Sequence, residues 1–136
     1  MTYTSSLKGI TPLMLRGFYE GWPQKPSPRT HLLLLKNSDH VVLAVDARTN
    51  KVIGFITAIS DGVLCAYIPL LEVLPEYRKQ GIGSELVKRM LKKLKGLYMI
   101  DLLCDKSVQP FYLRHGMAKA TGMLIRNRAM QAGRKR

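Results

Sequence analysis

The 136-residue sequence has no long uninterrupted apolar run, and this absence excludes a membrane-spanning helix. A helix needs roughly 20 consecutive apolar residues to cross a bilayer, and no stretch approaches that length. The first residues show no apolar core of a signal peptide. Only two cysteines are present, without metal-ligand spacing, which is too few for a disulfide framework. We therefore expect a cytoplasmic protein that has no membrane contact and binds no metal.

Acidic residues are also scarce. Nine Asp and Glu stand against 22 Lys and Arg, which gives a formal net charge of +13. Such a balance raises the hypothesis of a nucleic-acid-binding protein. The sequence has only three Phe, and it lacks the interleaving of aromatic and basic residues that stacks bases. Nucleic acid is therefore the weaker interpretation, since a solvated helix face or a polyanionic cofactor also accounts for positive charge.

The composition is that of one globular domain. Hydrophobic residues make up 46% and charged residues 23%, which is ordinary for a folded chain of this length. There are no internal repeats and no low-complexity linker. We expect a single domain over residues 1–128 and a flexible basic tail over residues 129–136.

Residues 70–94, LLEVLPEYRKQGIGSELVKRMLKKL, indicate a strand, a tight turn and a helix. Pro75 ends the strand because proline gives no N–H to a sheet. After Gly81 and Gly83, apolar residues recur with helical spacing. A helix start exposes unpaired N–H groups and a partial positive charge, which suit a phosphate. The glycine spacing alone leaves an ordinary turn as an equal alternative.

The other segments predict a mixed sheet flanked by helices. Residues 12–21 indicate a helix that Thr11 caps and Gly21 ends, and Thr30 is the expected cap of a second helix ending near Asn37. Three strands joined by short connections should form an antiparallel meander, and the strand after the long helix should run parallel to the third of them. The expected strands cover residues 40–47, 52–60, 63–74 and 97–104, followed by a helix over 108–115 and a last strand over 117–125.

Two segments resemble signatures of the GNAT superfamily of N-acetyltransferases. Residues 73–83, VLPEYRKQGIG, match every position of the motif V-x-P-x-[YF]-[RQ]-x-x-G-x-[GA] that binds acetyl-CoA in that family. Residues 111–117, FYLRHGM, match its second signature, [FLA]-Y-x-x-x-G-[FM]. Asp105 and Val108 replace the Asn and Ala that often precede that Tyr. The resemblance covers about residues 41–117. It implies an α/β (α+β) fold, with a mixed, mostly antiparallel sheet of about six strands and about four flanking helices.

The resemblance also implies the cosubstrate and its site. In GNAT enzymes the strand before the glycine turn splays away from its parallel neighbour, and its exposed N–H groups bind the pantetheine arm and polarise the acetyl carbonyl. That role falls by position to Val73, with Leu71 beside it, while the turn would hold the pyrophosphate. The expected acetyl-CoA contacts are Leu71, Val73, Arg78, Lys79, Gln80, Gly81, Ile82, Gly83 and Ser84.

The implied reaction is transfer of acetyl to a primary amine by direct attack in a ternary complex. The resemblance makes Tyr112 the candidate general acid for the leaving thiolate, although its spacing alone is also that of a core tyrosine. Glu72, alone among apolar strand residues, is the candidate base, directly or through water. A side chain that simply faces solvent is an equal alternative for Glu72, and Asp101 is a weaker base.

The acceptor stays open among small amines, amino acids, antibiotics and peptide amines. Trp22 and Tyr67 are candidates for lining its pocket. Two other functions remain as alternatives: a non-catalytic domain that binds acyl-CoA, and a basic protein that binds nucleic acid. A homodimer is compatible with the family.

Overall fold

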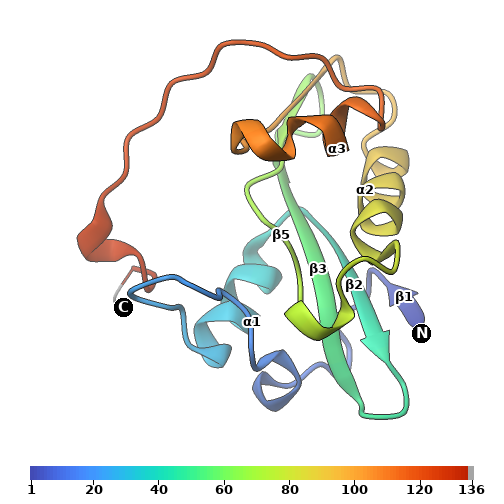
Figure 1. The fold of residues 1–136 in the computed structure, drawn as a ribbon, viewed down its shortest axis with the longest axis vertical. Coiled ribbons are helices and arrows are strands. Elements are labelled where there is room, and N and C mark those ends of the chain that lie inside the picture. The colour runs from blue at the N-terminus through green and yellow to red at the C-terminus, as the bar shows by residue number, and fades with distance from the viewer. Residues whose placement is uncertain (135–136) are drawn as a thin grey trace.

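The computed structural model describes residues 1–134, and its centre is a six-stranded sheet with helices on both faces (Figure 1). Strand order is β1-β2-β3-β4-β6, and β5 also pairs with β3. All pairs are antiparallel except β4 with β6. This confirms the mostly antiparallel sheet and the predicted parallel pair. The strands are β1 (Thr2–Thr4), β2 (His40–Asp46), β3 (Lys51–Ser60), β4 (Cys65–Tyr67), β5 (Leu71–Val73) and β6 (Met99–Asp101).

The sequence predicted about four helices, and the described part of the chain has three α-helices. They are α1 (Pro28–Asn37), α2 (Ile82–Lys93) and α3 (Gln109–Leu113). Short 3-10 turns occupy Pro12–Leu15, Pro75–Tyr77, Lys106–Val108 and Arg128–Met130. Between residues 1 and 134, no helix has the length and apolar character needed to cross a membrane.

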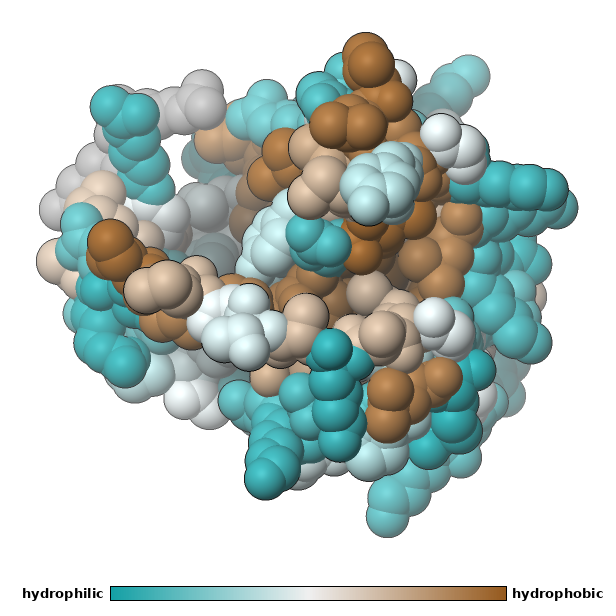
Figure 2. All heavy atoms as spheres, turned by 90° about the horizontal axis from the view of Figure 1, so that it is seen from above, coloured by the Kyte–Doolittle hydropathy of each residue, from teal (hydrophilic) through white to brown (hydrophobic). Residues whose placement is uncertain are grey.

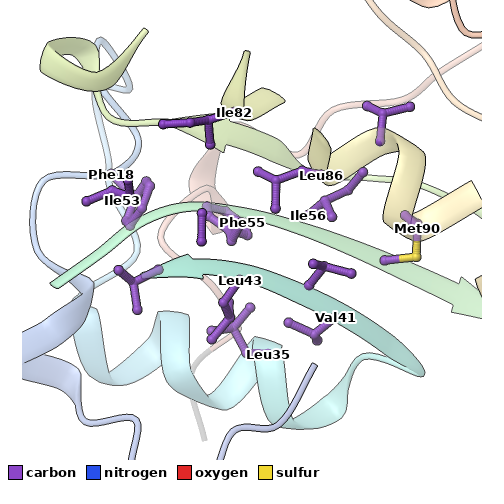
Figure 3. Packing of buried hydrophobic residues seen from close by; sticks show 14 of the residues in the cluster. Phe18, Leu35, Val41, Leu43, Ile53, Phe55, Ile56, Ile82, Leu86 and Met90 are labelled. Carbon is purple, nitrogen blue, oxygen red and sulfur yellow. The ribbon is translucent and has the colours of Figure 1, made fainter. Parts of the chain in front are cut away.

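The core lies on both faces of β2 and β3. Figure 3 shows Leu86 and Met90 of α2 on one side of these strands, and Leu35 of α1 on the other. Gly54 of β3 allows close packing here, because a Cβ at this position would lie 3.1 Å from the Leu86 side chain. The apolar spacing of α2 thus fixes which of its faces meets the sheet.

The first predicted helix is wrong beyond its first turn. The chain forms a 3-10 turn at Pro12–Leu15, and then Gly17 and Tyr19 adopt left-handed backbone conformations, with φ of 97° and 64°. Left-handed residues cannot continue a right-handed helix. The next helix begins at Pro28, earlier than expected, because the Ser27 hydroxyl, rather than Thr30, caps it: Ser27 Oγ accepts the Thr30 N–H at 3.1 Å.

The strand expected over residues 63–74 is two strands. Pro69 lies between β4 and β5 and has no N–H for a ladder, so the chain is interrupted there. The strand over 117–125 is absent: residues 118–127 are exposed and form no strand. The predicted strand 97–104 and helix 108–115 are shortened to β6 and α3. The division into residues 1–128 and a tail stays a prediction, and residues 135–136 of that tail lie outside the described residues.

His31 of α1 is buried in an aromatic cluster with Phe18, Tyr19 and Phe55. Its ring centroid lies 4.4 Å from that of Phe55 and 5.3 Å from that of Phe18. Neither ring nitrogen has a hydrogen-bond partner among the described residues. Burial therefore lowers the pKa of His31 from 6.5 to about 4, because the charged imidazolium would lose its hydration.

We expect the free energy of unfolding to decrease as the pH falls from 6.5 toward 4. In this window the unfolded chain binds a proton at His31 that the folded chain does not, so protonation favours unfolding. The full loss is on the order of 3 kcal/mol. Urea denaturation at pH 7 and pH 4.5 measures most of it. His31→Leu should remove this part of the pH dependence, and an unchanged dependence would contradict the assignment.

Candidate functional site

β5 is paired along one edge only. Ladder hydrogen bonds of 3.1 and 2.8 Å join Leu70 and Leu74 to β3. Backbone groups of successive residues point to opposite edges of a strand, so those of Leu71 and Val73 point away from β3. No described strand pairs with that outer edge, because β6 pairs with β4 instead. This is the splayed arrangement that the sequence resemblance implies.

The N-terminus of α2 lies next to this edge and has no side-chain cap. Its N-cap is Gly81, with a left-handed φ of 81°, and no side chain of residues 1–134 caps it with a hydrogen bond. The first helical hydrogen bond runs from Glu85 N to Gly81 O. The N–H groups of Ile82, Gly83 and Ser84 are therefore free of the helix ladder and can bind an anion.

Gly83 brings three elements together. A Cβ on this residue would lie 3.8 Å from the Val73 side chain of β5 and 3.8 Å from the Phe111 ring of α3. A hydrogen bond of 3.0 Å between Ser84 Oγ and His115 Nε2 holds α3 against the first turn of α2. Sequence reasoning missed this contact, since nothing in the spacing of two residues 31 positions apart indicates it.

Tyr112 lies on α3 in a half-buried position against the core. Its ring centroid is 5.0 Å from that of Phe111, which is the residue that faces Gly83. Burial raises the pKa of the Tyr112 hydroxyl to about 12, and the nearby Cys104 thiol adds to the rise. The hydroxyl is consequently protonated at neutral pH and can donate a proton.

Glu72 is partly buried, and its carboxylate is engaged by backbone N–H groups. Its carboxylate accepts the Tyr19 N–H at 2.8 and 3.0 Å and the Glu20 N–H at 3.4 Å. It holds the left-handed conformation of Tyr19, which follows the 3-10 turn Pro12–Leu15. Backbone N–H acceptors give no sequence signal, so only the structure shows this contact. The role of Glu72 as a base stays a prediction.

Glu72→Ala is expected to destabilise the fold by about 1–3 kcal/mol, because the buried Tyr19 N–H loses its acceptor. Glu72→Gln retains an amide oxygen and should recover most of that loss. Urea denaturation measures both variants. If Glu72→Gln folds like the original protein but loses turnover, the carboxylate also acts in catalysis; equal destabilisation by the two substitutions would contradict the hydrogen-bond account.

The remaining predicted residues of the turn are exposed. Arg78 is directed to β5: its Nε donates to Val73 O at 3.0 Å, and its Nη1 lies 3.3 Å from Glu20 Oε2. Lys79 has a left-handed φ of 62°, and Gln80 follows it on the surface. Asp101 is exposed at the end of β6, where it lies opposite Tyr67 of β4 and not in β5.

A cavity of about 380 Å³ lies on the α1 side of the sheet. Buried hydroxyls of Tyr19 and Thr57 line it without a hydrogen-bond partner in the described residues. Burial raises the pKa of Tyr19, and the charge of Glu72 raises it further.

Arg134 is the one charged side chain among the described residues that line this cavity. Trp22 lines this cavity, and Tyr67 does not. The apolar walls come from Trp22, Leu33, Leu34, Ile59, Leu70 and Met130.

Comparison with known proteins agrees with this geometry. The profile of the acetyltransferase (GNAT) family matches residues 7–117. The uncharacterized N-acetyltransferase ycf52 of Pyropia yezoensis is 26% identical over 123 residues, covering 86% of this chain and 70% of that protein. A ycf52-like N-acetyltransferase of Prochlorococcus marinus is 31% identical over 71% of this chain, which spans 55% of its length. The crystal structure of a Deinococcus radiodurans R1 protein assigned as an acetyltransferase is 46% identical, with a TM-score of 0.96, covering 99% of this chain and 94% of that one.

Proposed function

Because the chain belongs to the acetyltransferase (GNAT) family, we propose that it transfers acetyl from acetyl-CoA to a primary amine by direct attack in a ternary complex. An acetyl-transferring activity follows from the family; the cosubstrate, the acceptor and a cytoplasmic location are the proposal. The observation that carries it is the unpaired edge of β5 beside the uncapped start of α2. The two sets of N–H groups are close to each other, since a Cβ on Gly83 of α2 would lie 3.8 Å from the Val73 side chain of β5, and they can serve one long anionic molecule.

The residues present fit acetyl-CoA. Its pyrophosphate suits the free N–H groups at Ile82, Gly83 and Ser84, where the helix dipole favours negative charge. Gly83 has no side chain to fill the space between Val73 and Phe111. The Val73 N–H points to the same edge and is the candidate donor to the acetyl carbonyl. Lys79 and Gln80 would flank the phosphates.

Two proton transfers complete the proposed reaction. The attacking amine forms the C–N bond and gives up a proton to Glu72, directly or through water. The C–S bond breaks, and the thiolate receives the Tyr112 proton. The raised pKa of Tyr112 keeps its hydroxyl protonated until charge develops on the sulfur. A lysine-like amine has a free pKa of about 10, so removal of its proton is a necessary step.

We place the acceptor in the cavity on the α1 side. A contact of the candidate base supports this placement: Glu72 accepts the Tyr19 N–H, and Tyr19 lines the cavity. Apolar walls and Arg134, the one cationic side chain among the described lining residues, favour an amine with an apolar body over a polycation. The unpartnered hydroxyls of Tyr19 and Thr57 supply hydrogen bonds for its polar groups.

Calorimetric titration with acetyl-CoA, followed by a CoA-release assay across amines, tests the function. We expect binding, and faster release with phenethylamine than with spermidine or an aminoglycoside. No binding at millimolar acetyl-CoA would overturn the proposal. Binding without release for any amine would support the non-catalytic acyl-CoA-binding alternative, and a preference for spermidine would contradict the assigned acceptor cavity.

A further inference from the structure

A groove of about 610 Å³ lies between β1 and α2, at the end of the sheet opposite β6. Figure 1 shows β1 at the outer edge of the sheet, on the same side of the molecule as α2. One wall of the groove consists of Tyr3, Thr4 and Ser5, and the other is a face of α2. The groove shares no lining residue with the acceptor cavity, and the glycine turn does not line it, so it is a separate surface.

The α2 wall of this groove is strongly basic. Lys88, Arg89, Lys92 and Lys93 line it, and Glu85 is the one acid among the described lining residues. Glu85 Oε2 accepts a hydrogen bond from Arg89 Nε at 2.8 Å, so the acid is neutralised within the wall. None of the three lysines forms an ion pair with a described residue. Figure 2 shows hydrophilic side chains projecting on the side where α2 lies in Figure 1. The groove therefore attracts an anionic partner.

The β1 wall contributes an unpaired strand edge. β1 is the last strand at this end of the sheet and pairs with β2 alone. Backbone groups of alternate residues point to opposite edges of a strand, so β1 has N–H and C=O groups directed away from β2, where no described strand lies. Tyr3 and Thr4 belong both to this strand and to the groove lining. An extended segment of another chain can pair with such an edge.

The spacing of the lysines also matches an extended segment. Lys88 and Lys92 are four positions apart in one helix, which places them about 6 Å apart along its axis. In an extended chain, side chains on the same face recur about every 7 Å. A segment with an acidic residue at every second position can thus present successive carboxylates to successive lysines.

Nucleic acid and a second copy of the chain fit the groove less well. Tyr3 is the one aromatic residue among the described lining residues, and Arg89 Cζ lies 4.6 Å from the centre of its ring. That face of the ring is therefore covered by the guanidinium and does not offer a stacking platform for a base. A second copy lacks the acidic pattern, because no two acidic residues of the sequence are closer than four positions.

We propose that the groove binds an extended acidic segment of another protein, which adds as a strand to the outer edge of β1 and pairs its carboxylates with the lysines of α2. Main-chain hydrogen bonds to β1 supply affinity in this mode of recognition, and the alternating carboxylates supply selectivity. Because the groove is separate from the acceptor cavity and from the glycine turn, this interaction does not depend on the proposed acetyl transfer.

Fluorescence anisotropy with a labelled peptide in which Glu alternates with Val tests the charge pattern. We expect binding that weakens as salt is added, and weaker binding of a peptide with the same composition but all its Glu residues grouped together. Lys88→Glu combined with Lys92→Glu should weaken binding on the order of 100-fold, because attraction becomes repulsion. Both side chains are exposed, so the unfolding temperature should not change. Lys88→Gln combined with Lys92→Gln removes the attraction alone and should weaken binding about 10-fold.

Lys25→Glu combined with Lys36→Glu is the matched control. It changes the net charge equally, but both side chains are exposed in or before α1 and neither lines the groove. This pair should change peptide affinity little. An equal loss of affinity in the control pair would show that only the overall charge attracts the peptide, and the proposed groove would be wrong.

Hydrogen exchange followed by nuclear magnetic resonance tests the strand edge. With the alternating peptide bound, the β1 amides directed away from β2 should exchange more slowly. The proposal is overturned if the peptide does not bind at low salt, if the Lys88 and Lys92 substitutions leave binding unchanged, or if binding slows no β1 amide. Displacement of the peptide by acetyl-CoA would also overturn it, as would tighter binding of a single-stranded oligonucleotide or of anionic lipid vesicles through the same lysines.

Discussion

Gly83→Asp is expected to abolish acetyl-CoA binding, with a loss of affinity on the order of 100-fold or more. The new carboxylate would enter the space between Val73 and Phe111, where the cosubstrate is proposed to pass. It would also place negative charge at the helix start that is proposed to bind the pyrophosphate, so repulsion adds to the steric block. Calorimetric titration with acetyl-CoA measures the effect directly.

Gly83→Ala separates blocking from misfolding. Its Cβ would lie 3.8 Å from both neighbours, an ordinary contact, and Gly83 does not have a left-handed φ. The alanine variant should therefore unfold at the same temperature as the original protein. Gly81 is the less suitable position, because its φ of 81° strains any side chain. If Gly83→Asp binds acetyl-CoA normally, the proposed cosubstrate site is wrong.

Tyr112→Phe is expected to lower turnover by roughly 100- to 10,000-fold while changing acetyl-CoA affinity little. The hydroxyl is the proposed donor to the leaving thiolate, and phenylalanine preserves the packing against Phe111 while removing that proton. The pKa of Tyr112, raised to about 12, predicts in addition that turnover does not decline through loss of this proton between pH 7 and 9.5. Steady-state kinetics over that range checks both expectations.

Tyr67→Phe is the matched control, because Tyr67 is a partly exposed tyrosine that does not line the cavity. It should leave turnover and affinity unchanged. If Tyr112→Phe turns over as fast as the original protein, the general acid is another group. A parallel loss of affinity and turnover would instead assign Tyr112 a role in binding.

The sequence predicted those parts of the site that lie close together in the chain. Pro75, Gly81 and the apolar spacing of α2 act over a few residues, so the order strand–turn–helix follows from local geometry. The structure confirms that order, and it shows a left-handed conformation at Gly81 that a glycine permits. The short connections between β2, β3 and β4 likewise fixed their antiparallel pairing.

The strand prediction erred where an element needs a distant partner to decide its form. Residues 117–125 alternate like a strand, yet alternation only states that two faces differ, and no described strand lies beside them. Tyr19 has helix-compatible neighbours, but the carboxylate of Glu72, 53 positions away, holds its N–H in a left-handed turn. Periodicity and local propensity describe neighbouring residues, so they do not predict a hydrogen bond between residues this far apart in the sequence.

The sequence by itself determined the helix that starts at a glycine turn, and it predicted that residues 78–84 hold the pyrophosphate. Local backbone preferences are sufficient for that, since they depend on neighbours within one turn. The tertiary structure alone decided that β5 has an edge with no described strand beside it, that His115 holds α3 on Ser84, and that Glu72 binds the Tyr19 N–H. Each of these depends on which distant segments meet, and burial of the common core determines that choice. The strand–turn–helix is therefore a local property of the sequence, and its place beside an unpaired strand is a property of the fold.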